Sequence, residues 1–320
     1  MKTKFLLLFF TLVLVSCGSE SVFESDNHLL PKSSEQTELN SVYARIDSIN
    51  TVYISQVSTR GFWGWLISNE ITTAADNVGR VAGSWVGRSA GSLVGSLTGN
   101  PVCTVLGYVG GRWAGGIAGS VAASYVASKV FNCTVVSDNL NTYSFEVSET
   151  MSVGEIHNSI LLRLFQNEER YLNSDYTINY DVLLTDCARF AEEIDSTQYD
   201  STSISSCMPL IVEQVRMIEK SAYEFEKGSS DTIEDLYNIM YDNIVKVCPI
   251  SREEYEQCMM IDLKLGATYA SLDPESAKQC EREIDLTIES SKLNDEVKEN
   301  LRSSNSVVAN SAIIWNQLGK

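Results

Sequence analysis

Apolar side chains recur every three or four positions along the second half of the chain. One such run lies between residues 156 and 165, and another lies between 210 and 223. The apolar members of the two runs are Ile156, Ile160, Leu161, Leu164, Phe165, Leu210, Val212, Val215, Ile218 and Tyr223. This period puts apolar residues on one face of a helix. We therefore expect residues 132–320 to form an α-helical domain, a bundle of about six or seven amphipathic helices.

The same region contains sequence signals for helix starts. Ser152 and Glu155 have the spacing of a capping box, in which a hydroxyl and a carboxylate satisfy each other's backbone N–H groups. Ser251 with Glu254, and Asp231 with Glu234, follow the same logic. The pair 273–274, Asp-Pro, predicts a further start, because proline suits the first helical position.

A different pattern precedes this domain, where glycine recurs every four residues. The two runs are Gly79, Gly83, Gly87, Gly91, Gly95 and Gly99, and then Gly107, Gly111, Gly115 and Gly119, continued by Ala123 and Ala127. Residues i and i+4 share one helix face, so each run predicts a helix with a smooth stripe of small residues. Asn100-Pro101 predicts a turn between them. We expect two antiparallel helices, Thr73 to Thr98 and Val102 to Phe131.

Such a stripe needs a partner. Each glycine costs a helix about 1 kcal/mol relative to alanine. Close approach of another helix can offset that cost, either within the hairpin or between copies of the chain. Each helix is long enough to span a bilayer, but Arg88 and Arg112 make both poor spans. The pattern suits a segment that is soluble first and enters a membrane later, or that lines a wet pore.

The first residues predict export. Lys2 and Lys4 precede an apolar run, Phe5 to Val15, that is too short to span a bilayer. The tetrapeptide that follows, Leu14-Val15-Ser16-Cys17, resembles the lipobox of bacterial lipoproteins. The resemblance implies that residues 1–17 are a lipoprotein signal peptide and that Cys17 carries diacylglycerol. The alternative is an ordinary secretory signal with an incidental cysteine.

Residues 18–60 are polar and predict a tether, with a helical stretch near Leu39 to Tyr53. Residues 61–65, Gly-Phe-Trp-Gly-Trp, open the segment 61–131 with three large aromatic side chains. Such side chains favour a membrane interface, and the alternative is a staple onto the hairpin that follows.

Charge and cysteine content narrow the function classes. The formal net charge is -18, and the acidic excess lies in residues 132–320. This acidic balance argues against nucleic-acid binding, since a protein that binds a phosphate backbone needs a basic surface. Seven cysteines remain after Cys17, an odd number, and we expect disulfides in the helical domain. Cys103 and Cys133 flank the second glycine-rich helix and lie too far apart to pair with each other.

No motif for a catalytic triad, a zinc protease, a phosphate cradle or a dinucleotide site occurs. We therefore expect no enzyme, no catalytic residue, no cofactor and no metal site. Residues 153–158, Val-Gly-Glu-Ile-His-Asn, resemble a helix-opening motif of uncharacterised Bacteroidota proteins. His157 is either a ligand or base, or a histidine that bonds nearby backbone, and we favour the second interpretation.

The whole layout resembles a known kind of toxin. A glycine-zipper hairpin with aromatic flanks resembles double-glycine-stripe bacteriocins, and the chain resembles Bacteroidota lipoprotein toxins that an Arg-specific, clostripain-like protease activates. The resemblance implies a bacteriocin-like antibacterial protein that acts on a lipid bilayer. It would be lipid-anchored at the outer membrane or cell surface and released to the medium after cleavage at Arg60–Gly61. Arg60 is otherwise one loop arginine among many.

Two other functions remain open. The chain also resembles small surface-antigen lipoproteins of the periplasm and outer membrane. That resemblance implies a structural or binding lipoprotein whose hairpin is an anchor or a device for homo-oligomerisation. The third function is immunity or scaffolding for a neighbouring toxin.

Overall fold

The computed structural model describes residues 33–57, 112–130, 151–197, 199–227, 233–246, 252, 265–266, 268–269 and 271–318. This part of the chain is helical and contains no strand beyond one isolated bridge, between Leu172 and Ile178. The all-α fold class is therefore confirmed for the described residues.

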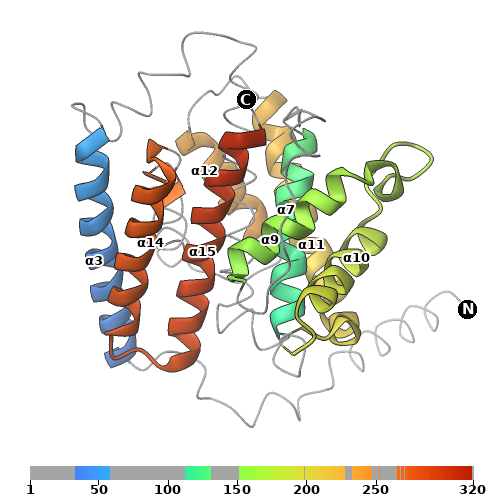
Figure 1. Ribbon diagram of the computed structural model, residues 1–320. Helices are drawn as coiled ribbons and strands as arrows, with labels where there is room; N and C mark the ends of the chain where they lie inside the picture. The colour runs from blue at the N-terminus through green and yellow to red at the C-terminus, as the bar shows by residue number, and fades with distance from the viewer. Residues whose placement is uncertain are drawn as a thin grey trace, which may run out of the picture.

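The helices follow one another along the chain with short 3₁₀ turns between some of them (Figure 1). They are α3 (Ser33–Val57), α7 (Arg112–Val130), α9 (Val153–Phe165), η1 (Glu168–Tyr171), α10 (Tyr180–Ile194), η2 (Ser201–Ser203), α11 (Ile204–Lys227), α12 (Ile233–Ile244), α14 (Pro274–Glu289) and α15 (Asp295–Leu318).

Two of the predicted helix starts are present as expected. The Ser152 hydroxyl accepts from the Glu155 backbone N–H, and the Glu155 carboxylate accepts from the Ser152 backbone N–H, a complete capping box on α9. Asp273 caps α14 through the backbone N–H groups of Glu275 and Ser276, with Pro274 at the first helical position. The expected caps at Asp231 and Ser251 lie outside the described residues.

The described residues form two hydrophobic cores, and the first of them surrounds α7. This helix packs against α9, α10 and α11, and Figure 1 shows it in the middle of these elements. Apart from the partly buried Lys129, its described side chains between 117 and 130 are buried. A helix buried on all sides needs apolar or small residues all round, and α7 has them.

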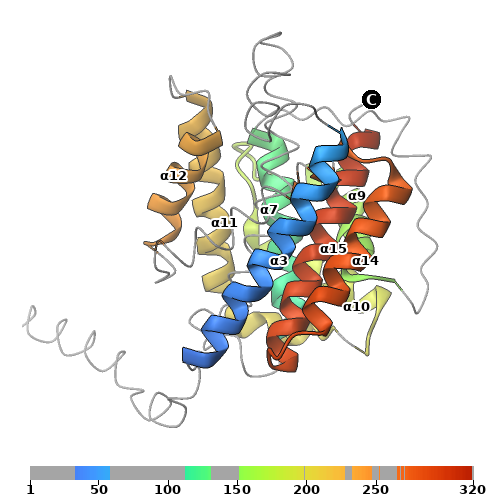
Figure 2. The same cartoon turned by 90° about the vertical axis from the view of Figure 1, so that its left-hand side faces the viewer.

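The second core lies among α3, α14 and α15. Val42 and Ile46 of α3 are buried in it together with Ile284 and Ile288 of α14. Both views show α3 beside α14 (Figures 1 and 2). The helix expected near residues 39–53 is thus present as α3, and this part of the expected tether belongs to the folded body.

Two further expectations have mixed outcomes. The second glycine-rich helix, expected over 102–131, is confirmed as a helix over 112–130, whereas its expected partner over 73–98 and the turn at Asn100-Pro101 lie outside the described residues. The expected disulfides are not found at Cys187 and Cys280, which are buried free thiols. Each packs as a small apolar side chain in one of the cores, and burial raises the pKa of both thiols.

Candidate functional site

The candidate site is α7 with the residues that enclose it. Ala118, Ala122 and Ala123 are fully buried, and Gly119 is buried as well. Ala118 and Ala122 share one face of the helix, and Gly119 and Ala123 share the adjacent face, so the four form one broad stripe of small residues. Small residues allow backbones to approach closely, and here the partners include three other helices of the same chain.

Aromatic rings enclose the C-terminal end of α7. The Tyr125 ring lies 5.6 Å from the Phe165 ring and 5.8 Å from the Tyr171 ring, centroid to centroid. The Lys129 ammonium lies over both Tyr125 and Phe165, at 5.4 and 5.8 Å, and pairs with Glu168. A cation at this end is also favoured by the helix dipole.

His157 of α9 contacts the middle of α7. Its Nε2 lies 3.2 Å from the Ser124 Oγ, and its Nδ1 lies 3.2 Å from the Asn158 Oδ1. The ring is fully buried, and this burial lowers the pKa of His157 to about 4, although hydrogen bonds to Asn158 and to the Ser120 backbone oppose the shift. The histidine is therefore neutral at pH 7.

The order hydroxyl, imidazole, amide resembles the geometry of a nucleophile, its base and an orienting group. Ser124 and His157 are both completely inaccessible to solvent, however, and Asn158 is 3% exposed. A substrate carbonyl has no route to the Ser124 hydroxyl in this conformation. The arrangement supports the interpretation of His157 as a packing residue that joins α9 to α7.

The first turn of α9 also lies directly against α15. The Gly154 backbone N–H donates to the Ser306 Oγ at 3.2 Å, and the Asn158 amide donates to the Asn310 carbonyl at 2.9 Å. A Cβ at position 154 would lie 2.2 Å from the Ser306 carbonyl oxygen. Residues 153–158 therefore connect the two cores. Sequence reasoning singled out this motif but did not reveal that its glycine is required by a backbone 152 positions further along the chain.

Two partly buried acids, Glu281 and Asp285, lie near this junction, on the side of α14 that faces α15. The Asn305 amide donates to the Asp285 carboxylate at 3.0 Å and to the Glu281 backbone carbonyl at 3.2 Å. Burial raises the pKa of Glu281 to about 7, and the nearby charges of Asp285 and Glu155 add to the shift. Among the described residues no group of three acidic, cysteine or histidine side chains is placed to hold a metal ion.

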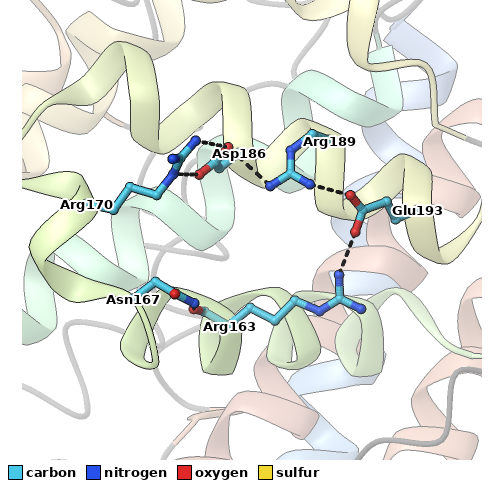
Figure 3. Close-up of polar contacts among 6 residues, drawn as sticks. All are labelled: Arg163, Asn167, Arg170, Asp186, Arg189 and Glu193. Carbon is cyan, nitrogen blue, oxygen red and sulfur yellow. Dashed lines mark hydrogen bonds and ion pairs between the residues drawn. The ribbon is translucent and has the colours of Figure 1, made fainter.

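An ion-pair network covers the outer side of α9 and α10 (Figure 3). Asp186 accepts from Arg170 and Arg189, and Glu193 pairs with Arg189 and Arg163. Burial alone would raise the pKa of Asp186, but the hydrogen bond and charge of Arg170 outweigh it and lower the pKa. The arginines are already paired, so the network fastens η1 and α9 to α10 over the enclosed helix.

Of the site residues predicted from sequence, Gly115 and Gly119 lie on α7. Cys17, Arg60 and Gly61 lie outside the described residues, as do the glycines from Gly79 to Gly111. No helix among those described is both long enough and apolar enough to cross a membrane. Comparison of the chain with protein-family models, with curated proteins and with solved structures finds no match.

Proposed function

We propose that the chain is an exported lipoprotein, anchored through Cys17, that encloses a membrane-active glycine-rich segment in its helical bundle. Cleavage near Arg60 converts this stored form into a bacteriocin-like antibacterial protein. The observation that supports the proposal is the burial of α7, the described part of the glycine series, on all of its described sides. A segment that later enters a membrane must be sheltered from water beforehand, and amphipathic helices of the same chain can provide that shelter.

The core around α7 contains buried polar groups that lack hydrogen-bond partners, and such groups make it less stable than a fully satisfied core. The hydroxyls of Ser120 and Tyr125 on α7, and of Ser159 on α9, are buried without a protein partner among the described residues. A buried polar group without a partner costs about 1–3 kcal/mol. These groups lower the free energy needed to withdraw the helix from the bundle.

Vesicle leakage tests the proposal. Purified lipoprotein is incubated with an Arg-specific protease and with dye-loaded vesicles that contain anionic lipid, and cleavage is followed by N-terminal sequencing. We expect a new N-terminus at Gly61 and release of dye. Arg60→Gln should abolish both, whereas Arg45→Gln, at an exposed arginine of α3, should leave both intact. Vesicles that stay sealed after complete cleavage would refute a membrane-active function.

A second function is favoured by the partners that α7 already has. Its small residues pack against α9, α10 and α11 of the same chain, so intramolecular packing can account for this half of the stripe. The chain would then be a structural or binding lipoprotein of the outer membrane. Cell fractionation distinguishes the two functions, because a structural lipoprotein stays uncut in the membrane and is harmless to related strains.

A further inference from the structure

Helix α3 is held to the rest of the molecule by contacts with residues more than 200 positions later in the sequence. The Tyr53 hydroxyl donates to the Glu283 Oε1 at 3.0 Å, and the Lys292 backbone N–H donates to the Glu38 Oε1 at 3.0 Å. Residues late in α3 therefore meet the middle of α14, and residues early in α3 meet its end. The two helices run antiparallel, side by side (Figures 1 and 2).

The contact between α3 and α14 is mostly apolar. Val42 is 0% exposed, Ile46 3% and Tyr53 6%, and all three belong to the core that contains Ile284 and Ile288. Ala44 and Ser48 lie on the opposite face of α3 and are exposed, as is the apolar Val52 on the same face. One buried polar pair, Thr268 with Asn50, joins α3 to the segment just before α14. Such a pair favours one register, because a slip would leave both groups buried and unpaired.

Charge does not account for the attraction. Within α3, Glu35, Glu38 and Asp47 outnumber Arg45. Within α14, Glu275, Glu281, Glu283, Asp285 and Glu289 outnumber Lys278 and Arg282. Both helices are thus net acidic, and the burial of apolar side chains must exceed their mutual repulsion. Salt screens that repulsion, so we expect the contact to be tighter at higher ionic strength.

The position of α3 in the sequence makes this contact significant. The helix lies after Cys17 and before Arg60, so hydrolysis of the Arg60–Gly61 peptide bond by water leaves α3 on the lipid-bearing fragment. We propose that α3 is a non-covalent docking helix that keeps the folded body on its lipid anchor after the chain is cut. The inference rests on the proposed cleavage, and it makes cleavage and release two separate steps.

The test uses the full lipidated chain in detergent, with an affinity tag inserted after Glu20 and a site-specific protease sequence inserted between Arg60 and Gly61. After complete cutting, the tagged fragment is captured and the captured fraction of the C-terminal body is measured. We expect nearly all of the body to be captured with wild-type α3. The captured fraction should be higher in about 0.5 M salt, where the Debye length is roughly 4 Å, than in about 0.02 M salt, where it is roughly 20 Å.

Matched variants show whether the α3 contact is responsible. Ile46→Asp places a charge in the contact and should reduce capture at least tenfold after cutting, whereas Ser48→Asp adds the same charge on the exposed face and should not. Tyr53→Phe, which removes only the hydrogen bond to Glu283, should speed loss of the body severalfold. Circular dichroism of each uncut variant verifies that it folds, and Val42→Asp replaces Ile46→Asp if that variant does not.

Loss of the wild-type body on cutting would overturn the inference, and so would full capture with the charged contact variants. Because the inserted sequence is cut by its own protease, this result does not depend on whether the natural Arg-specific cut occurs. Failure of vesicle leakage would remove the proposed toxin activity and leave the docking result standing. If the body is retained and the charged contact variants do not change its capture, the body is attached through other residues. That result also refutes a role for α3.

Discussion

At the scale of single residues, the residues that matter most join elements that are distant in sequence. Gly154 lies on α9 against the α15 backbone, and His157 lies between α9 and α7. Glu281 lies near the same junction on α14. The packing around each of these residues determines the effect of substituting or protonating it, so each gives a prediction about stability.

Gly154→Ala should destabilise the protein by about 2 kcal/mol or more. Alanine normally favours a helix over glycine by about 1 kcal/mol, but here its Cβ would clash with the Ser306 backbone. Urea denaturation measures the change. Gly266→Ala is the matched control, because its Cβ would meet only Val308 Cγ1 at 3.7 Å and should leave stability equal or higher. Equal effects of both substitutions would contradict the close approach.

His157 predicts a loss of stability in acid. Its pKa is about 4 in the folded protein and 6.5 in the unfolded chain, so the unfolded chain binds more protons between these values. The free energy of unfolding should therefore fall by roughly 3 kcal/mol as pH drops from 6.5 to 4. His157→Gln should flatten this slope and His28→Gln should not. Identical slopes in wild type and His157→Gln would show that the imidazole is not buried as a neutral group.

Glu281 predicts the opposite dependence on pH. Its pKa is raised from 4.5 to about 7, so the folded protein binds the extra proton between these values. Its contribution to stability is present at low pH and is lost as pH rises towards 7. Glu281→Gln should remove this part of the slope in denaturation curves taken at several pH values. Glu275→Gln, at an exposed acid of the same helix, serves as control and should not change the slope.

At the scale of elements, α7 differs from its neighbours. α10, α11 and α14 each have one apolar face. Helix α7 is instead rich in glycine, alanine and serine, and it carries no charge between Arg112 and Lys129. This composition allows neighbouring helices to approach it from several sides. The packing of α7 against its neighbours thus depends on the volume of its side chains more than on their polarity.

Ala123→Leu should therefore destabilise the fold by about 1–3 kcal/mol, since extra volume in a packed core forces side chains and backbone apart. The thermal midpoint by circular dichroism measures the effect. Ala44→Leu makes the same substitution on the exposed face of α3 and should stay within about 0.5 kcal/mol of wild type. If Ala123→Leu has no effect, α7 is not closely enclosed.

In the vesicle-leakage assay, Gly91→Leu and Gly115→Leu should abolish activity if the glycine stripe is used in the membrane.

At the scale of the whole molecule, two cores are joined through the contact of α9 with α15. The chain carries a formal net charge of -18, so repulsion between acidic groups opposes folding on balance. Exposed ion pairs such as Arg302 with Glu289 contribute little against this repulsion.

Added salt should accordingly stabilise the fold. Raising sodium chloride through the physiological range shortens the Debye length to about 8 Å and screens the repulsion between acidic groups. We expect the thermal midpoint to rise by several degrees between low and moderate salt, measured at constant pH. A midpoint that falls over this interval would mean that ion pairs such as Asp186 with Arg170 outweigh the general repulsion.

Local pattern alone was sufficient to determine much of this protein. The apolar period of three to four, the capping box at Ser152 and the Asp273-Pro274 start depend on neighbours within one or two turns, and the helices they predict are present. The four-residue glycine and alanine period likewise predicted α7, because helix geometry is set by spacing along the chain.

Only the tertiary structure decided what each helix packs against. The four-residue period of glycine and alanine indicated that α7 needs close neighbours, but it did not indicate that α9, α10 and α11 are among them. The polar composition of residues 18–60 concealed the few apolar positions of α3 that meet α14. Contacts such as Gly154 with Ser306 join residues 152 positions apart, and no local pattern specifies which distant surfaces meet. The physical reason is that the free energy of burial depends on shape and volume across the whole core, whereas the apolar period and the caps that signal a helix lie within a few turns of one segment.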